Sequence, residues 1–133
     1  MAENNNIATV RAYFRALEAG EAGERLSRFF SEQAIQIELP NKLNPAGGTS
    51  DLATIKRRSE EGKHLLQEQR YALISIVAEG DNLAVEAEWT GVLAVPVAGL
   101  PTGYEMKAHL AMFFKFRDGR IVLQRNYDCF ESW

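Results

Sequence analysis

The sequence predicts an α+β fold, in which helices cover one side of a mostly antiparallel sheet. Two amphipathic helical patterns and one alternating segment open the chain, a third helix follows, and four alternating segments separated by turns complete it. Helices segregated to one side of consecutive strands define this class. With 133 residues, 46% of them hydrophobic and 25% charged, the chain has the size and composition of one globular domain, so we expect residues 1–133 to form a single domain.

The two N-terminal helices are predicted from the spacing of apolar residues. Between Ile7 and Leu17, apolar side chains recur at i, i+3, i+4 and i+7, which gives a helix one buried stripe, and the preceding asparagines are good N-caps. Gly20 is expected to end this helix. A second, short helix is expected from about Ala22 to Phe30, with its own apolar stripe.

The middle of the chain predicts one strand, one loop and one helix. Residues 34–39 alternate like a strand, and residues 40–48 form an irregular loop that contains two prolines and two glycines. A third helix is expected from about residue 52 to residue 66. The basic triplet at 56–58 falls on its less apolar side, where we expect it to face solvent.

The last half of the chain has the period of two that is typical of strands. Four strands are expected at Tyr71–Glu79, Leu83–Val95, Tyr104–Phe116 and Ile121–Phe130. The first two are joined by a turn at residues 80–82 and the last two by Asp118-Gly119, a strong hairpin signal because both residues tolerate positive φ. Four consecutive strands therefore form an antiparallel sheet.

Composition and charge exclude several classes of function. A formal net charge of -3 and a pI near 5.4 disfavour nucleic acid as a partner, since they would repel phosphates. The single cysteine, Cys129, is expected to be buried, and no C-x-x-C motif or histidine pair predicts a metal site. No apolar run reaches the length of about 18 residues that spans a membrane, so we expect a cytoplasmic protein with no membrane partner.

The final strand carries the most informative pattern, because Gln124, Asn126 and Asp128 alternate with other residues and so share one face. If Arg117-Asp118-Gly119 forms a bulged loop, Phe116 pairs with Arg120. In that register the side chains of the preceding strand lie opposite those of the last one as Ala108 with Asp128, Leu110 with Asn126, Met112 with Gln124 and His109 with Tyr127.

A loop of only two residues, Asp118-Gly119, is the alternative register. The pairing then slips by one, and His109 comes opposite Asp128 as an acid/base couple.

The order of these elements resembles the nuclear-transport-factor-2-like superfamily, in particular its SnoaL-like branch. The resemblance rests on the helix Val10–Leu17, the Glu38-Leu39-Pro40 exit from the first strand, and Phe116–Ile121 leading to Tyr127. It implies a cone-shaped α+β barrel, with a curved, mostly antiparallel sheet wrapped around the N-terminal helices. It also implies a ligand cavity on the concave side and frequent homodimers through the outer face.

Individual residues carry over from the superfamily only in part. In its ketosteroid isomerases the first strand ends with a catalytic aspartate before a proline, and Leu39 takes that position here. The isomerase oxyanion aspartate corresponds to Met112, and Tyr13 stands near the isomerase tyrosine. The resemblance therefore disfavours steroid isomerase chemistry.

Other branches leave different residues in place. In the epoxide hydrolases an Arg-x-Asp pair on a middle strand and an aspartate on the last strand correspond to Glu86, Glu88 and Asn126. The cyclase branch often has an aspartate beyond the last-strand tyrosine, whereas Asp128 follows Tyr127 directly. The resemblance favours the bulged register, with positions 124, 126 and 128 facing the cavity.

We therefore expect a cavity that binds a small, largely apolar molecule, and a homodimer that forms through an apolar outer face. The expected catalytic residues are Asp128, Asn126 and Glu88. The expected substrate-binding residues are Tyr13, Glu86, Leu39, Leu110, Met112 and Gln124, and the expected outer face comprises Val85, Ala87, Trp89, Phe113 and Leu123.

The leading hypothesis is a cofactor-free acid/base enzyme of isomerase, cyclase, lyase or epoxide-hydrolase type. Asp128 and Asn126 would polarise the substrate while Glu88 shuttles a proton, because carboxylates crowded in one pocket repel and at least one of them titrates high. The alternative is a noncatalytic ligand-binding or dimeric assembly module, supported by Leu39 in place of the base.

Overall fold

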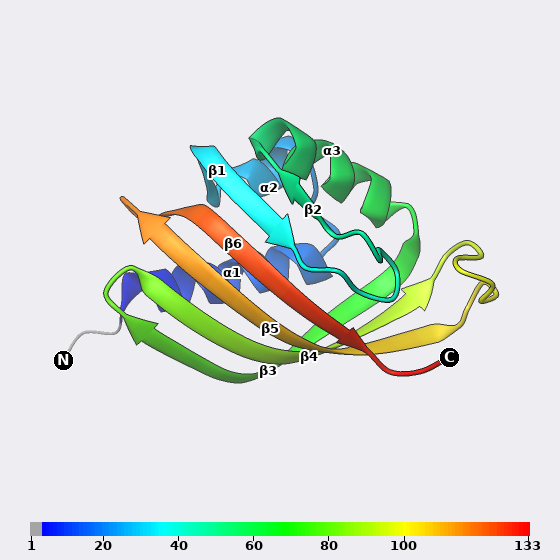
Figure 1. The fold of residues 1–133 in the computed structure, drawn as a ribbon. Coiled ribbons are helices and arrows are strands. Elements are labelled where there is room, and N and C mark those ends of the chain that lie inside the picture. Colours follow the sequence, from blue (N-terminus) through cyan, green and yellow to red (C-terminus); the bar gives the residue numbers. More distant parts are fainter. Residues whose placement is uncertain (1–3) are drawn as a thin grey trace.

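The computed structural model describes residues 4–133, which form three helices and six strands (Figure 1). The elements follow the chain as α1 (Asn5–Glu18), α2 (Glu24–Ser27), β1 (Phe30–Glu38), β2 (Gly48–Ser50), α3 (Leu52–Lys63), β3 (Leu66–Glu79), β4 (Asn82–Leu93), β5 (Glu105–Arg117) and β6 (Arg120–Phe130). The predicted α+β class is confirmed.

One six-stranded sheet runs in the order β2-β1-β6-β5-β4-β3. Strands β1 and β6 pair in parallel and the other neighbouring strands pair in antiparallel. The sheet is strongly curved and open, and α1 lies in its concave side while α3 stands over the β1 end (Figure 1). This is the cone-like arrangement that the family resemblance implies.

Helix α1 begins where Asn4 accepts a hydrogen bond from the backbone of Asn6, as expected for an asparagine N-cap. Its apolar stripe of Val10, Tyr13 and Phe14 is at most 4% exposed and packs against the concave face of the sheet. The predicted amphipathic stripe is therefore the contact that joins helix and sheet.

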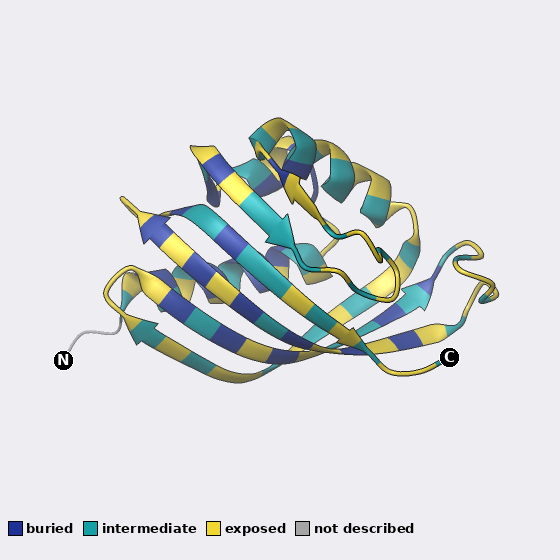
Figure 2. Cartoon of the chain, viewed as in Figure 1, coloured by how far each residue is buried: buried dark blue, intermediate teal, exposed yellow. Residues whose placement is uncertain are grey.

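Alternation along the strands sorts side chains between the two faces of the sheet (Figure 2). On β4, Val85 and Ala87 are buried against the core, whereas Glu86 and Glu88 are exposed on the convex side. The prediction that these glutamates line the cavity is wrong. The apolar residues of an alternating strand take the core face, and this requirement outweighs the family correspondence that placed the carboxylates inside.

The β5–β6 hairpin combines features of both predicted registers. Only Asp118 and Gly119 form the turn, since Arg117 pairs with Arg120, but a bulge at Val122 then shifts the pairing by one residue. As a result Leu110, Met112 and Phe114 lie opposite Asp128, Asn126 and Gln124, and His109 lies opposite Cys129. The predicted pairs are wrong, but the prediction that the even-numbered polar residues face inward holds, because the bulge restores that side.

The predicted outer face is also partly wrong. Val85 and Ala87 belong to the core, and Trp89 lies on the concave side, while Phe113 is 39% exposed on the convex side and Leu123 is partly exposed there. Assembly into a homodimer through this face stays a prediction, as does the assignment of residues 1–133 to a single domain.

Smaller differences concern the ends of elements. The short edge strand β2 was not predicted, α2 is limited to one turn, and β1 begins at Phe30. Cys129 is exposed, not buried, because it falls on the convex side between Asp128 and Phe130. None of the helices described within residues 4–133 has the length and apolar content needed to cross a bilayer.

Candidate functional site

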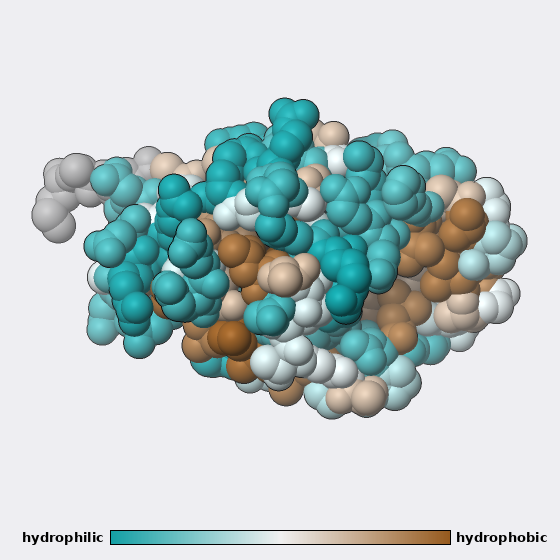
Figure 3. All heavy atoms as spheres, turned by 90° about the horizontal axis from the view of Figure 1, so that it is seen from above, coloured by the Kyte–Doolittle hydropathy of each residue, from teal (hydrophilic) through white to brown (hydrophobic). Residues whose placement is uncertain are grey.

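A cavity of about 370 Å³ lies between α1, α3 and the concave face of the sheet. Its mouth is at the end of the molecule opposite the N-terminus, where apolar side chains gather around a hollow in the surface (Figure 3). Leu43, Leu65 and Val97 contribute to this rim from three separate loops. An apolar entrance of this kind suits an apolar ligand.

One side of the cavity is polar. We call it the polar wall, and it consists of Glu38 on β1 with Gln124, Asn126 and Asp128 on β6. The parallel register places Glu38 beside Asn126, so both side chains point to the concave side. Alternate residues on one strand face are about 6.6 Å apart, close enough for Asn126 and Asp128 to contact the same small molecule.

A directed chain of amide groups fixes the orientation of Asn126. The Oε1 atom of Gln124 accepts hydrogen bonds from Gln36 Nε2 at 3.0 Å and from the Tyr13 hydroxyl at 3.5 Å. Gln124 Nε2 then donates to Asn126 Oδ1 at 3.0 Å. Because its oxygen is occupied, Asn126 has its Nδ2 group available to donate to a ligand.

Tyr13 is a buried donor in this chain. Burial raises the pKa of its phenol to about 12, although the hydrogen bond to Gln124 acts in the opposite direction. The phenol is therefore protonated at neutral pH and keeps its role as a donor. Tyr13 also packs edge-on against Phe29 and Phe30, so it serves both the core and the cavity.

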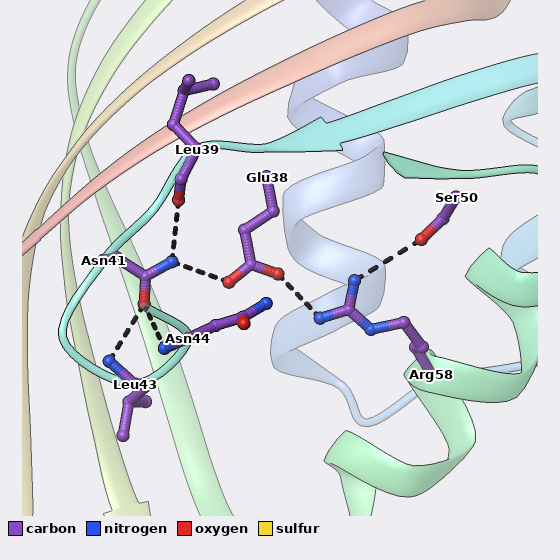
Figure 4. Close-up of polar contacts among 7 residues, drawn as sticks. All are labelled: Glu38, Leu39, Asn41, Leu43, Asn44, Ser50 and Arg58. Atoms are coloured by element: carbon purple, nitrogen blue, oxygen red, sulfur yellow. Dashed lines mark hydrogen bonds and ion pairs between the residues drawn. The ribbon is translucent and has the colours of Figure 1, made fainter. Parts of the chain in front are cut away.

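Glu38 is held in place by two partners (Figure 4). Arg58 on α3 donates to Glu38 Oε1 at 2.7 Å, and Asn41 Nδ2 donates to Glu38 Oε2 at 2.7 Å. The Oδ1 atom of Asn41 accepts from the backbone amides of Leu43 and Asn44, which leaves its Nδ2 for Glu38. Burial alone would raise the pKa of Glu38, but the hydrogen bonds from Asn41 and Arg58 outweigh it and lower the pKa. Glu38 is thus a fixed carboxylate.

Asp128 has the opposite electrostatic character. Burial raises its pKa to about 6, and the negative charge of Glu38 adds to the shift. Among residues 4–133 no side chain donates a hydrogen bond to the Asp128 carboxyl group. A carboxyl group that titrates near neutral pH and faces a cavity is suited to exchange a proton with a ligand.

The other side of the cavity is apolar and largely aromatic. We call it the aromatic wall, and it consists of Phe14, Tyr71, Trp89 and Phe130. Tyr71 and Trp89 are cross-strand partners, and the ring of Trp89 meets Phe130 edge-on at 6.1 Å between centroids. Burial, followed by the nearby charges of Tyr13 and Asp128, raises the pKa of Tyr71, so its phenol also stays protonated.

Six of the nine predicted site residues line the cavity: Tyr13, Leu110, Met112, Gln124, Asn126 and Asp128. The other three, Leu39, Glu86 and Glu88, do not. Leu39 uses its backbone N–H to bond Asn126 at 3.0 Å, and its side chain alternates away from the face of Glu38. Leu39 was predicted to bind substrate, but the residue that lines the cavity at this end of the strand is Glu38.

Four further residues line the cavity and were not predicted to do so from the sequence: Glu38, Arg58, Tyr71 and Trp89. The signal for Glu38 is the alternation of Gln36 and Glu38 on the first strand, which repeats the polar spacing of the last strand. Arg58 was expected to face solvent with the rest of the basic triplet. A carboxylate buried beside α3 explains its different position, since it needs a cation.

Within residues 4–133, no group of three or more histidine, cysteine, aspartate or glutamate side chains is arranged to hold a metal ion. His109 contacts Glu131 at 3.0 Å on the exposed side of the sheet, away from Asp128. The polar wall offers carboxyl and amide groups, and Tyr13 adds a phenol beside them.

Comparison with family models gives one match. The model of the SnoaL-like domain covers residues 10–124, which is most of the chain and includes most of α1, strands β1 to β5 and the first half of β6. The chain belongs to the SnoaL-like family. A comparison with curated proteins found no match.

Three solved structures illustrate the similarity of fold. IdmH from Streptomyces antibioticus, a proposed polyketide cyclase, is 19% identical, with 94% of this chain and 92% of that chain covered at a TM-score of 0.77. AclR from Streptomyces galilaeus, a proposed hydroxylase, is 18% identical, with 93% and 78% covered at 0.76. TerC, co-crystallised with polyporic acid, is 16% identical, with 94% and 92% covered at 0.72. At these identities the similarity establishes the fold.

Proposed function

We propose that this SnoaL-like protein binds a small, largely apolar molecule that carries an oxygen-containing group. We further propose that Asp128 takes a proton from this molecule and returns it. The observation that carries the proposal is a cavity-facing carboxyl group whose pKa is raised to about 6 beside a fixed carboxylate. The activities proposed for IdmH and AclR, and the complex of TerC with polyporic acid, support a ligand of this kind.

In the proposed reaction, the apolar part of the substrate lies against the aromatic wall and its oxygen accepts a hydrogen bond from Asn126 Nδ2. The ionised Asp128 takes a proton from the carbon next to a carbonyl group. The electron pair of the broken C–H bond moves toward the oxygen, where Asn126 stabilises the developing charge. Return of the proton to another atom completes an isomerisation. In a cyclisation the carbanion instead attacks a second carbonyl carbon of the same molecule, the electron pair of that C=O bond moves to its oxygen, and Asp128 returns the proton to this oxygen.

Hydration would use the same two groups: Asp128 takes a proton from water as the water oxygen attacks a C=C bond conjugated to the carbonyl group, and then returns that proton to the carbon next to the carbonyl. Dehydration is the reverse of these steps. Glu38 does not carry the proton in any of these schemes. Its ion pair with Arg58 and its bond to Asn41 keep it ionised, and its charge keeps Asp128 protonated to a higher pH. In this proposal Asp128 carries the proton, and Glu38 provides a fixed negative charge beside it.

A noncatalytic ligand-binding module is the second candidate. It is favoured by the position of Glu86 and Glu88 on the convex side, which removes the predicted proton shuttle from the cavity. Under this hypothesis the polar wall orients a ligand without changing it.

A ligand screen followed by turnover assays tests the proposal. Oxygenated aromatic compounds are screened by thermal shift, where a ligand at 100 times its Kd stabilises by about 2.7 kcal/mol. Each binder is then incubated with the wild-type protein and with Asp128→Asn. We expect turnover that falls by about 10²- to 10⁴-fold in the variant while binding is retained. Equal turnover by both proteins contradicts the role of Asp128, and binding without turnover by the wild type supports the second candidate.

A further inference from the structure

The indole ring of Trp89 occupies the space that a side chain at position 91, two residues further along the same strand, would take. A Cβ atom placed on Gly91 would be 2.4 Å from Cζ2 and 2.5 Å from Cη2 of Trp89, and 3.2 Å from Cδ2 of Leu66. Real Cβ atoms essentially never approach another atom within 3.0 Å. Any larger residue at position 91 therefore displaces the indole ring.

A hydrogen bond holds the same ring from the side. Gln69 is the cross-strand partner of Gly91, and its Oε1 accepts from Trp89 Nε1 at 2.9 Å. The same oxygen lies 3.4 Å from the Tyr71 hydroxyl, and Gln69 Nε2 donates to the backbone oxygen of Leu17 at 3.2 Å. One amide group thus connects the aromatic wall to the end of α1.

Gln69 also marks the end of the cavity. A second hollow of about 290 Å³ begins beyond it, between the end of α1, the end of α3 and the start of β3. The two hollows share Leu17, Gly62, Leu66 and Gln69 as lining residues. These four residues therefore form the partition that limits the cavity on this side.

We propose that Gly91 and Gln69 together hold the ring of Trp89 in its place over Gly91, and that this arrangement sets the largest planar ligand that the cavity accepts. The inference rests on the proposed function in one respect, namely that the cavity is the ligand site. The sheet backbone closes one side of the indole, so a side chain at position 91 moves the ring into the cavity. Gly91 and Gln69 are positioning residues that act through Trp89.

The test compares Gly91→Ala with Gly48→Ala as a matched control. Gly48 also lies in a strand, but a Cβ atom there meets nothing within 4 Å. The probes are 1-naphthol and 1-hydroxypyrene, which differ in the number of fused rings, and their affinities are measured by isothermal titration calorimetry. We expect Gly91→Ala to bind 1-hydroxypyrene at least about tenfold more weakly and 1-naphthol within about twofold of wild type, because the displaced ring takes up part of the cavity. The control should match wild type for both.

Tryptophan fluorescence gives a readout that needs no ligand. The chain has two tryptophans, so a Trp133→Phe background leaves Trp89 as the only emitter. We expect the emission of Trp89 to change in Gly91→Ala and in Gln69→Leu, which removes the hydrogen bond while keeping a side chain of similar size. If Gly91→Ala does not fold, Gln69→Leu is used in its place, and we expect the same larger loss of affinity for 1-hydroxypyrene than for 1-naphthol.

The outcomes separate this inference from the proposed function. Unchanged Trp89 emission in the folded variants, or equal loss of both probes, overturns the inference and leaves the proposed function standing. Failure of the wild-type protein to bind either probe counts against the proposed ligand site, while the fluorescence comparison still decides whether Gly91 and Gln69 position Trp89.

Discussion

The two walls of the cavity differ in what their side chains contribute. On the polar wall, Glu38 and Asp128 are carboxyl groups whose pKa values move in opposite directions. On the aromatic wall, the polar atoms of Tyr71 and Trp89 contact Gln69. The comparison shows that the polar wall contains a group that titrates near neutral pH, whereas the aromatic wall forms the apolar surface against which a ligand would lie.

The largest expected effect that separates the walls is the pH dependence of stability in Asp128→Asn. Asp128 binds its proton more tightly in the folded protein, since its pKa is raised from 3.8 to about 6. Its contribution to stability is therefore fully present below pH 3.8 and is lost as pH rises through about 6. The variant should gain about 2 to 3 kcal/mol relative to wild type between pH 4 and pH 8.

Urea unfolding of both proteins at pH 4 and pH 8 measures this gain. A stability difference between variant and wild type that is the same at both values would show that Asp128 is not the titrating group.

The fixed carboxylate is tested by Arg58→Leu, which leaves the partly buried Glu38 without its cation. We expect a loss of about 1 to 3 kcal/mol, below the usual cost for a fully buried pair because the Arg58 side chain is 40% exposed. Arg57→Leu is the matched control, since the neighbouring Arg57 pairs with Glu61 on the surface and is 66% exposed.

Thermal or urea unfolding at pH 7 gives the comparison. The control should change by less than about 0.5 kcal/mol. Equal losses of unfolding free energy in the two variants would mean that the contact between Arg58 and Glu38 stabilises the protein no more than a surface ion pair does.

The aromatic wall is expected to respond differently. Tyr71→Phe removes the hydroxyl contact to Gln69 and should cost about 0.5 to 1 kcal/mol, because the bond is long at 3.4 Å. The cost should be the same at pH 4 and pH 8, since the phenol stays protonated throughout. A pH-dependent loss, measured in the same unfolding series, would show that the two walls are not separate in function.

The smallest effect is expected outside the cavity. Glu88→Gln changes an exposed side chain on the convex side, opposite His109. Stability should stay within about 0.5 kcal/mol of wild type, and the turnover of any substrate should be unchanged. A turnover assay in which this variant is inactive would restore the role that the sequence suggested for Glu88.

The sequence predicted the fold well because the relevant signals are local. The stripe of α1 and the alternation of β5 and β6 each fix which side is buried, and the Asp118-Gly119 turn fixes the hairpin. The bulge at Val122 could not be predicted, since it changes the pairing by one residue without changing the composition of either strand.

The candidate site was predicted only where it follows from one hairpin. Asn126 and Asp128 share a face by alternation alone, whereas the contact between Arg58 and Glu38 joins a helix to a strand 20 residues away. Glu86 and Glu88 were misplaced because the family correspondence was followed in place of the alternation within β4. The alternating apolar residues Val85 and Ala87 are the buried ones, so the glutamates between and after them face the other side.

The central claim is that Asp128 titrates near neutral pH inside the cavity, and carboxyl-carbon NMR of Asp128 tests it most directly. The signal is assigned by comparison with Asp128→Asn and followed from pH 3 to pH 9 in wild type and in Glu38→Gln. We predict a pKa of about 6 in wild type, and a lower value in Glu38→Gln because a neighbouring negative charge is removed. A wild-type pKa near 3.8, the ordinary value for aspartate, would contradict the proposed proton transfer.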